Sequence, residues 1–139
     1  MKSKTTLFAL TAIFAVSSTA LLADLELGDA SKLPPAAKTA GVTYDKDIKP
    51  IFEKSCVKCH SGEKPKGKYS METKDAILKG GKEGKGVIPG NSAKSALVHF
   101  TADIVKDSEM PPTDKRDKYP ALTKEQIGLV RAWIDQGAK

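Results

Sequence analysis

Cysteine is scarce in this chain of 139 residues, in which Cys56 and Cys59 are the only two. Two cysteines so close in sequence close a very small loop, so they do not form a disulfide scaffold. Aromatic residues make up only 6% of the chain, and no cluster of Lys and Arg is interleaved with them. A nucleic-acid-binding surface is therefore not expected. The length allows a single domain.

Long apolar runs are absent apart from residues 7–23, which follow Lys2 and Lys4 and carry no charge. A basic start, an apolar run and small residues at its end are typical of a secretory signal peptide. We predict that residues 1–23 are removed, that the protein is periplasmic, and that no stable membrane insertion follows. The alternative is a retained anchor, although about 17 residues is the lower limit for a spanning helix. Removal of two lysines lowers the formal charge from +6 to +4.

The rest of the chain divides into two parts. Residues 24–42 contain two glycines and the pair Pro34-Pro35 without any periodicity, which predicts a flexible leader. Residues 43–139 are predicted to form the folded domain. Its first helix places Ile48, Phe52 and Cys56 on one face, and Pro50 is acceptable there only in the first turn.

Three further helices are predicted along this domain. A short one covers about residues 73–79, and a longer one begins at Asn91 or Ser92 and ends near residue 103. The last helix begins with a capping box at Thr123 and Gln126. Its apolar face consists of Ile127, Val130, Trp133 and Ile134.

The resulting fold class is all-α, with about four short helices and long loops. Such an outline buries little apolar surface for a domain of ~95 residues. Long loops in a small domain are uncommon unless they are functional. A large, flat, apolar cofactor at the centre would provide the missing core.

Cys56-Val57-Lys58-Cys59-His60 indicates which cofactor this is. Two thiols separated by two residues reach both vinyl groups of a haem from one turn, and the following histidine then lies at the iron. The pattern is typical of covalent c-type haem attachment. We therefore predict one haem c held by both cysteines, with His60 as an axial ligand.

Three other interpretations of the motif remain open. A thioredoxin-like dithiol would be expected in a βαβ context, which the chain does not show. A zinc site needs four ligands, and the only other histidine, His99, lies 39 positions from His60. An incidental disulfide would leave the adjacent histidine unexplained.

The sixth ligand of the iron has three candidates: Met71, His99 and Met110. Met110 lies in a loop, and the two prolines that follow it restrict the backbone, which suits a weak thioether ligand. Met71 is expected to pack inward before a short helix. His99 lies almost opposite the apolar stripe of its helix and is expected to face solvent. Met110 is the preferred ligand; a loop methionine that only fills a gap in the core is the alternative.

Several short blocks occur in a recognisable order: Asp47-Ile48-Lys49-Pro50-Ile51-Phe52, the Cys motif, Gly80-Gly81, Ile88-Pro89-Gly90, Ser95, Met110-Pro111-Pro112 and Trp133-Ile134-Asp135-Gln136-Gly137-Ala138. This order resembles the planctomycete-type cytochrome c domain, a class I-like monohaem cytochrome, over residues 44–138. The resemblance implies a cytochrome c-like fold wrapped round one haem, in which the first and last helices pack against each other. It also implies that Met110 is the distal ligand and that the Pro89 carbonyl accepts a hydrogen bond from His60. Residues 113–120 are longer and more basic than the family pattern.

The predicted function is that of a monomeric, non-enzymatic carrier of single electrons. Lysines cluster around the motif and could steer it to redox partners with acidic docking surfaces: Lys54, Lys58, Lys64, Lys66 and Lys68. An ordinary solvated loop is the alternative for these lysines. For the whole protein, the alternatives are a haem peroxidase or ligand sensor with a labile sixth ligand, and an electron-relay module docked to a larger periplasmic enzyme.

Overall fold

The computed structural model describes residues 25–139, so the predicted signal peptide over residues 1–23 lies outside the described part. Four α-helices occur in this part: α1 (Lys49–Ser55), α2 (Lys74–Lys79), α3 (Ala96–Thr101) and α4 (Lys124–Asp135). Between them lie short helical turns and loops, and within residues 25–139 the only β pairing is an isolated bridge between Gly81 and Gly84. The all-α prediction is therefore confirmed.

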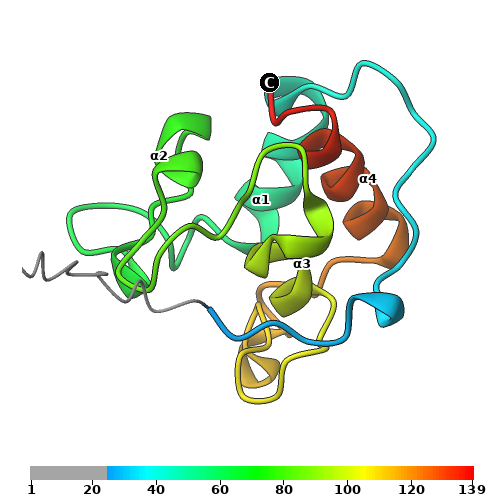
Figure 1. Cartoon of the computed structure of the whole chain (residues 1–139). Helices are drawn as coiled ribbons and strands as arrows, with labels where there is room; N and C mark the ends of the chain where they lie inside the picture. Colours follow the sequence, from blue (N-terminus) through cyan, green and yellow to red (C-terminus); the bar gives the residue numbers. More distant parts are fainter. Residues whose placement is uncertain (1–24) are drawn as a thin grey trace, which may run out of the picture.

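The first helical segment packs on the last one through Trp133. A π-helical turn, η2 (Tyr44–Ile48), leads directly into α1, with Pro50 in the first turn as predicted. The rings of Tyr44 and Phe52 lie 5.8 and 6.5 Å from the ring of Trp133, which is fully buried. The contact that the resemblance implied between the first and last helices is confirmed through Trp133. Figure 1 shows α1 beside α4.

Helix α4 begins as its sequence predicts. The Thr123 hydroxyl accepts a hydrogen bond from the Gln126 amide at 3.2 Å, and the Gln126 side chain accepts one from the Thr123 amide at 2.9 Å. Each residue thus satisfies an amide that has no partner within the helix. Gly137, with φ of +96°, ends the helix, because this left-handed conformation suits glycine.

The predicted third helix is interrupted at Ser95. A 3-10 turn, η4 (Ser92–Lys94), comes first, and α3 begins only at Ala96. Ser95 has extended backbone angles, and its hydroxyl donates to the Asn91 carbonyl and accepts from the Ile88 amide, both at 2.9 Å. The Ser95 side chain thus bonds to the preceding loop, and the backbone does not continue through this position as one helix.

The prediction of a flexible leader over residues 24–42 is wrong for residues 33–42. Leu33 and Val42 are buried, and the segment runs along α4 (Figure 1). The Ala37 amide donates to the Gly128 carbonyl at 2.8 Å, and Arg131 donates to the Pro34 carbonyl. We call residues 33–42 the strap. Its partners on α4 are distant in sequence, so composition alone did not indicate that the segment packs there.

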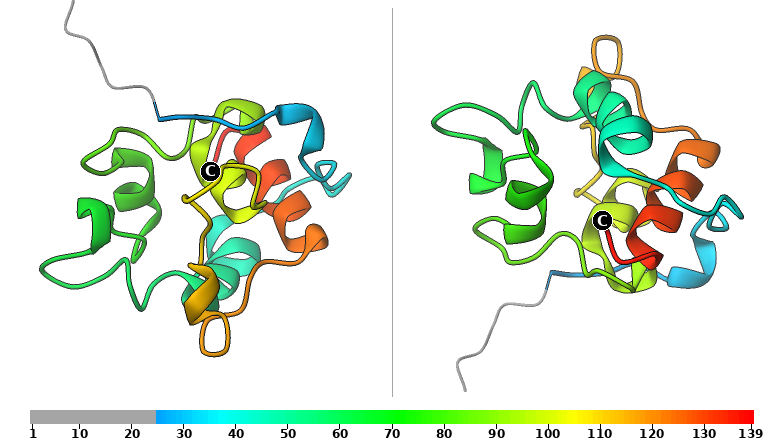
Figure 2. Two further views of the ribbon diagram at one scale, coloured as in Figure 1. Left: turned by 90° about the horizontal axis from the view of Figure 1, so that it is seen from below. Right: turned by 90° about the horizontal axis from the view of Figure 1, so that it is seen from above.

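Residues 61–86, which include α2, form a lobe set apart from the other three helices (Figure 2). The Met71 amide donates to the His60 carbonyl at 2.7 Å, and the Lys82 amide donates to the Gly67 carbonyl at 2.8 Å. These bonds tie the lobe to the end of the Cys motif and fold it back on itself. The space between the lobe and the helical core contains the candidate site.

Candidate cofactor site

Cys56, Cys59 and His60 lie within one turn at the end of α1. The Cys56 carbonyl accepts hydrogen bonds from the Cys59 and His60 amides, both at 3.1 Å. Cys56 is buried, and the other two side chains are half-buried. All three border a single cavity.

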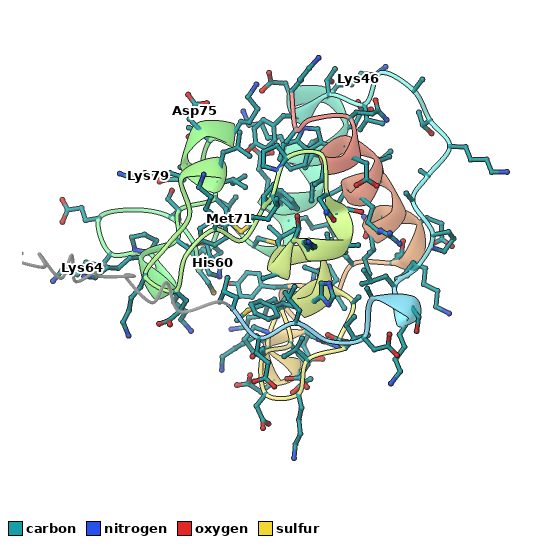
Figure 3. The ribbon with its side chains drawn as sticks, in the orientation of Figure 1. Lys46, His60, Lys64, Met71, Asp75 and Lys79 are labelled. Atoms are coloured by element: carbon teal, nitrogen blue, oxygen red, sulfur yellow. The ribbon has the colours of Figure 1, made fainter. Side chains whose placement is uncertain are left out.

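The cavity has a volume of about 330 Å³, at the lower end of the ≈ 300–1,000 Å³ found for cofactor and ligand sites. The lobe contributes Tyr69 and Met71 to its wall, and the core contributes Leu97, Phe100 and Met110. Figure 3 shows His60 and Met71 close together at the inner side of the lobe. The mostly apolar wall suits a large apolar ligand.

A hydrogen bond to Tyr69 orients the imidazole of His60. Its Nδ1 lies 2.9 Å from the Tyr69 carbonyl oxygen. Because a carbonyl oxygen only accepts, Nδ1 must carry the proton, which leaves the Nε2 lone pair free for a metal ion. The predicted bond from His60 to the Pro89 carbonyl is wrong. The residue after Pro89 is bonded to α4 instead, through the Gly90 amide and the Ile134 carbonyl at 2.7 Å.

Met110 and Met71 both border the cavity, but their backbones belong to different walls. The Met110 amide donates to the Phe100 carbonyl of α3 at 2.9 Å. Met71 is bonded through its amide to the His60 carbonyl, so it lies on the same side as the imidazole. The structure thus brings one of the two thioethers to the cavity from the core side.

His99 is not exposed as predicted; its side chain is completely buried. Its Nε2 lies 2.8 Å from the Ala93 carbonyl, and the residue does not border the cavity. The helical-wheel prediction failed because α3 is short and packed on several sides, so that Val98 is buried as well. His99 is therefore not placed to ligate a group bound beside His60.

The environment of the two cysteines does not match the other interpretations of the motif. They are not joined by a disulfide. Burial, with a smaller effect of Cys59, raises the pKa of the Cys56 thiol to about 12, whereas reactive dithiols depend on a lowered pKa. Among residues 25–139, no three His, Cys, Asp or Glu side chains gather as ligands of a metal ion, so a zinc site gains no support.

Tyr69 provides a test of whether haem suits this cavity. Its side chain borders the cavity, and its hydroxyl is buried without a hydrogen-bond partner among the described residues. Burial raises the pKa of this hydroxyl, so it remains a donor at neutral pH. A buried donor normally has an acceptor, and the haem propionates would supply one inside an otherwise apolar site. Two thiols, an oriented imidazole and this unpaired donor fit haem. No sequence motif indicated a role for the Tyr69 side chain.

Comparison with known proteins agrees with this site. Residues 56–114 match the family described as Planctomycete cytochrome C. The match begins at the first motif cysteine and ends just beyond Met110-Pro111-Pro112. No curated protein and no solved structure matched the chain.

The helical architecture and the matched segment define an all-α, cytochrome c-like fold. The match over residues 56–114 supports a planctomycete-type cytochrome c domain in this chain. A domain of this kind points to haem-based electron transfer. No helix within residues 25–139 has both the length and the apolar character needed to cross a membrane.

Proposed function

We propose that this protein is an exported one-electron carrier that binds one haem through Cys56 and Cys59 and ligates its iron with His60 and Met110. The observation that carries the proposal is the lining of one cavity, which combines an oriented imidazole and two thiols from a single turn with a methionine from a separate segment on the core side. Haem bound there would supply a one-electron ferrous–ferric couple.

The protein's own groups would set the properties of that couple. The Tyr69 carbonyl holds the imidazole of His60 in one tautomer and one orientation. Met71 shares a wall with His60, which leaves Met110 as the thioether that can approach from the other side. A sixth position filled by Met110 would restrict the site to electron transfer, because no coordination position stays open to a substrate.

The apolar wall also favours a relatively high reduction potential. Leu97 and Phe100 border the cavity from the core side with apolar side chains. A ferric iron carries one more positive charge than a ferrous iron, so a poorly solvated site stabilises the ferrous state. A thioether ligand acts in the same direction.

The ligand assignment is tested on holoprotein from a host that matures c-type cytochromes. The intact mass should show one covalent haem, and the ferric protein should show the weak far-red band of a thioether–iron bond. Met110→Ala should abolish this band and lower the potential by on the order of 0.1 V, within the ≈ 0.8 V span that axial ligands cover. Met71→Ala is the control and should keep the band. Loss of the band only in Met71→Ala would overturn the assignment.

We further propose that the carrier docks on redox proteins with acidic surfaces. The five lysines around the motif are all exposed: Lys54, Lys58, Lys64, Lys66 and Lys68. Within residues 25–139, the ion pairs include none of them. Lys66 also borders the cavity, where its charge would lie close to an exposed haem edge.

A further inference from the structure

Arg116 holds the backbone next to Met110 with one part of its guanidinium and Asp103 with the other. Its Nε–H donates to the Pro111 carbonyl at 3.0 Å. Its two terminal nitrogens donate to the two carboxylate oxygens of Asp103 at 2.8 and 2.7 Å. The Arg116 side chain therefore links Pro111, which follows Met110, to Asp103, which lies two positions after the end of α3.

These bonds close the base of the loop formed by residues 103–116, at the bottom of Figure 1. At the other end of the Met110-Pro111 dipeptide, the Met110 amide donates to the Phe100 carbonyl at 2.9 Å. The backbone of Met110-Pro111 is thus held at both of its ends. No α-helix lies within residues 103–116, so these bonds from outside the segment, together with the burial of Pro111, fix its backbone.

The geometry of this contact differs from that of the other ion pairs. The Arg116 side chain is only 25% exposed and binds Asp103 in a bidentate manner. The neighbouring pair of Lys115 and Asp114 is 51% and 68% exposed and involves a single contact. A planar guanidinium with parallel N–H bonds fixes orientation as well as distance, which an ammonium group does not.

We infer that Arg116 is a positioning residue that keeps Met110 directed into the cavity, and that Asp103 orients Arg116 for this purpose. The inference rests on the proposed role of Met110 as the sixth ligand. A thioether binds iron weakly, so the fraction of time it is detached depends on how firmly its backbone is held. Loosening the Arg116 contact should raise that fraction without removing the ligand.

The test measures how fast cyanide binds to ferric holoprotein, because cyanide enters only when the sixth position is vacated. Arg116→Gln and Arg116→Lys should each accelerate binding roughly tenfold, as expected for the loss of one or two hydrogen bonds to the loop. Asp103→Asn should accelerate it less, because the bond from Arg116 to the Pro111 carbonyl remains. The far-red band should weaken in the same order. Arg116→Lys keeps the positive charge, so faster cyanide binding in this variant would result from the lost orientation of the Met110 backbone and not from a lost charge.

Lys115→Gln is the matched control, since it removes one positive charge from the same turn and should change the rate less than twofold. Met110→Ala, measured alongside, tests the proposed function on its own. If Met110→Ala binds cyanide at the wild-type rate, both the ligand assignment and this inference fail. If Met110→Ala is fast while both Arg116 variants match the wild type, only the inference is overturned. Equal acceleration in Lys115→Gln would also overturn it, because the effect would then be one of general charge.

Discussion

Tyr69 and His60 are joined by a hydrogen bond of 2.9 Å between the Tyr69 carbonyl oxygen and Nδ1 of the imidazole. Their rings also meet edge to face, with centroids 5.9 Å apart. The Tyr69 hydroxyl, in contrast, is buried at the cavity without a partner among residues 25–139. Tyr69 can therefore act twice at this site, through its backbone on the histidine and through its side chain on the bound group.

Tyr69→Phe should lower the reduction potential of the holoprotein by about 40 mV. The substitution keeps the backbone bond to His60 and removes only the hydroxyl, so a propionate that it bonds would lose a donor. Its less compensated negative charge would favour ferric iron by about 1 kcal/mol. Spectroelectrochemical titration measures the change. Tyr44→Phe is the control, because the Tyr44 hydroxyl is equally buried and unpartnered but does not border this cavity. An unchanged potential in Tyr69→Phe would show that this hydroxyl has no acceptor on the haem.

Gly128→Ala should destabilise the domain, although alanine normally favours a helix by about 0.5–1 kcal/mol relative to glycine. A Cβ at position 128 would lie 2.8 Å from the Pro35 carbonyl oxygen, so either the strap or α4 must shift. We expect a net loss of about 1–2 kcal/mol in the free energy of unfolding. Hydrogen exchange at the Ala37 amide, which donates to the Gly128 carbonyl, should become faster. A variant more stable than the wild type, with the Ala37 amide still protected, would mean that the strap does not pack as described.

Ser95→Ala should lower the free energy of unfolding by about 1–3 kcal/mol. The Ser95 side chain is completely buried, and its removal leaves the Ile88 amide and the Asn91 carbonyl without their partner. Chemical denaturation followed by the fluorescence of Trp133 measures the change. Ser31→Ala, at an exposed position, is the control and should stay within about 0.5 kcal/mol of the wild type. Equal effects of the two substitutions would contradict a structural role for Ser95.

Lys66→Glu should slow oxidation of the ferrous protein by the small anionic oxidant ferricyanide. Lys66 borders the cavity, whereas Lys46, also exposed, lies at the top of Figure 3, away from Lys64 and His60. Lys46→Glu makes the same charge change and should have a smaller effect. The difference between the two variants should shrink at high ionic strength, because exposed charges are screened over about 8–10 Å. If the two variants react equally, the lysines near the motif do not steer partners.

Features that depend on neighbouring residues in the chain could be predicted from the sequence. Pro50 lies in a first turn, and Thr123 and Gln126 form their capping box, because these signals involve only a few adjacent residues. The turn formed by the Cys motif is equally local. The interruption at Ser95 was missed, because it arises from a bond to Ile88, which a helical pattern does not include.

Features that depend on tertiary packing were predicted less well. The helical wheel predicted that His99 is exposed, but a wheel describes a single helix and not the elements that pack around it. The imidazole of His60 bonds to the Tyr69 carbonyl and not to that of Pro89. Any carbonyl oxygen can accept this bond, and only the tertiary fold decides which carbonyl lies near the imidazole. The strap was missed for a related reason, since its partners are backbone and side-chain groups of α4.

The burial of Cys56 has a consequence for how the protein must be made. With 8% of its surface exposed, this thiol lies out of reach of any enzyme once the domain has closed. If both cysteines carry haem as proposed, ligation has to occur on an open chain, and the lobe can close over the cofactor only afterwards.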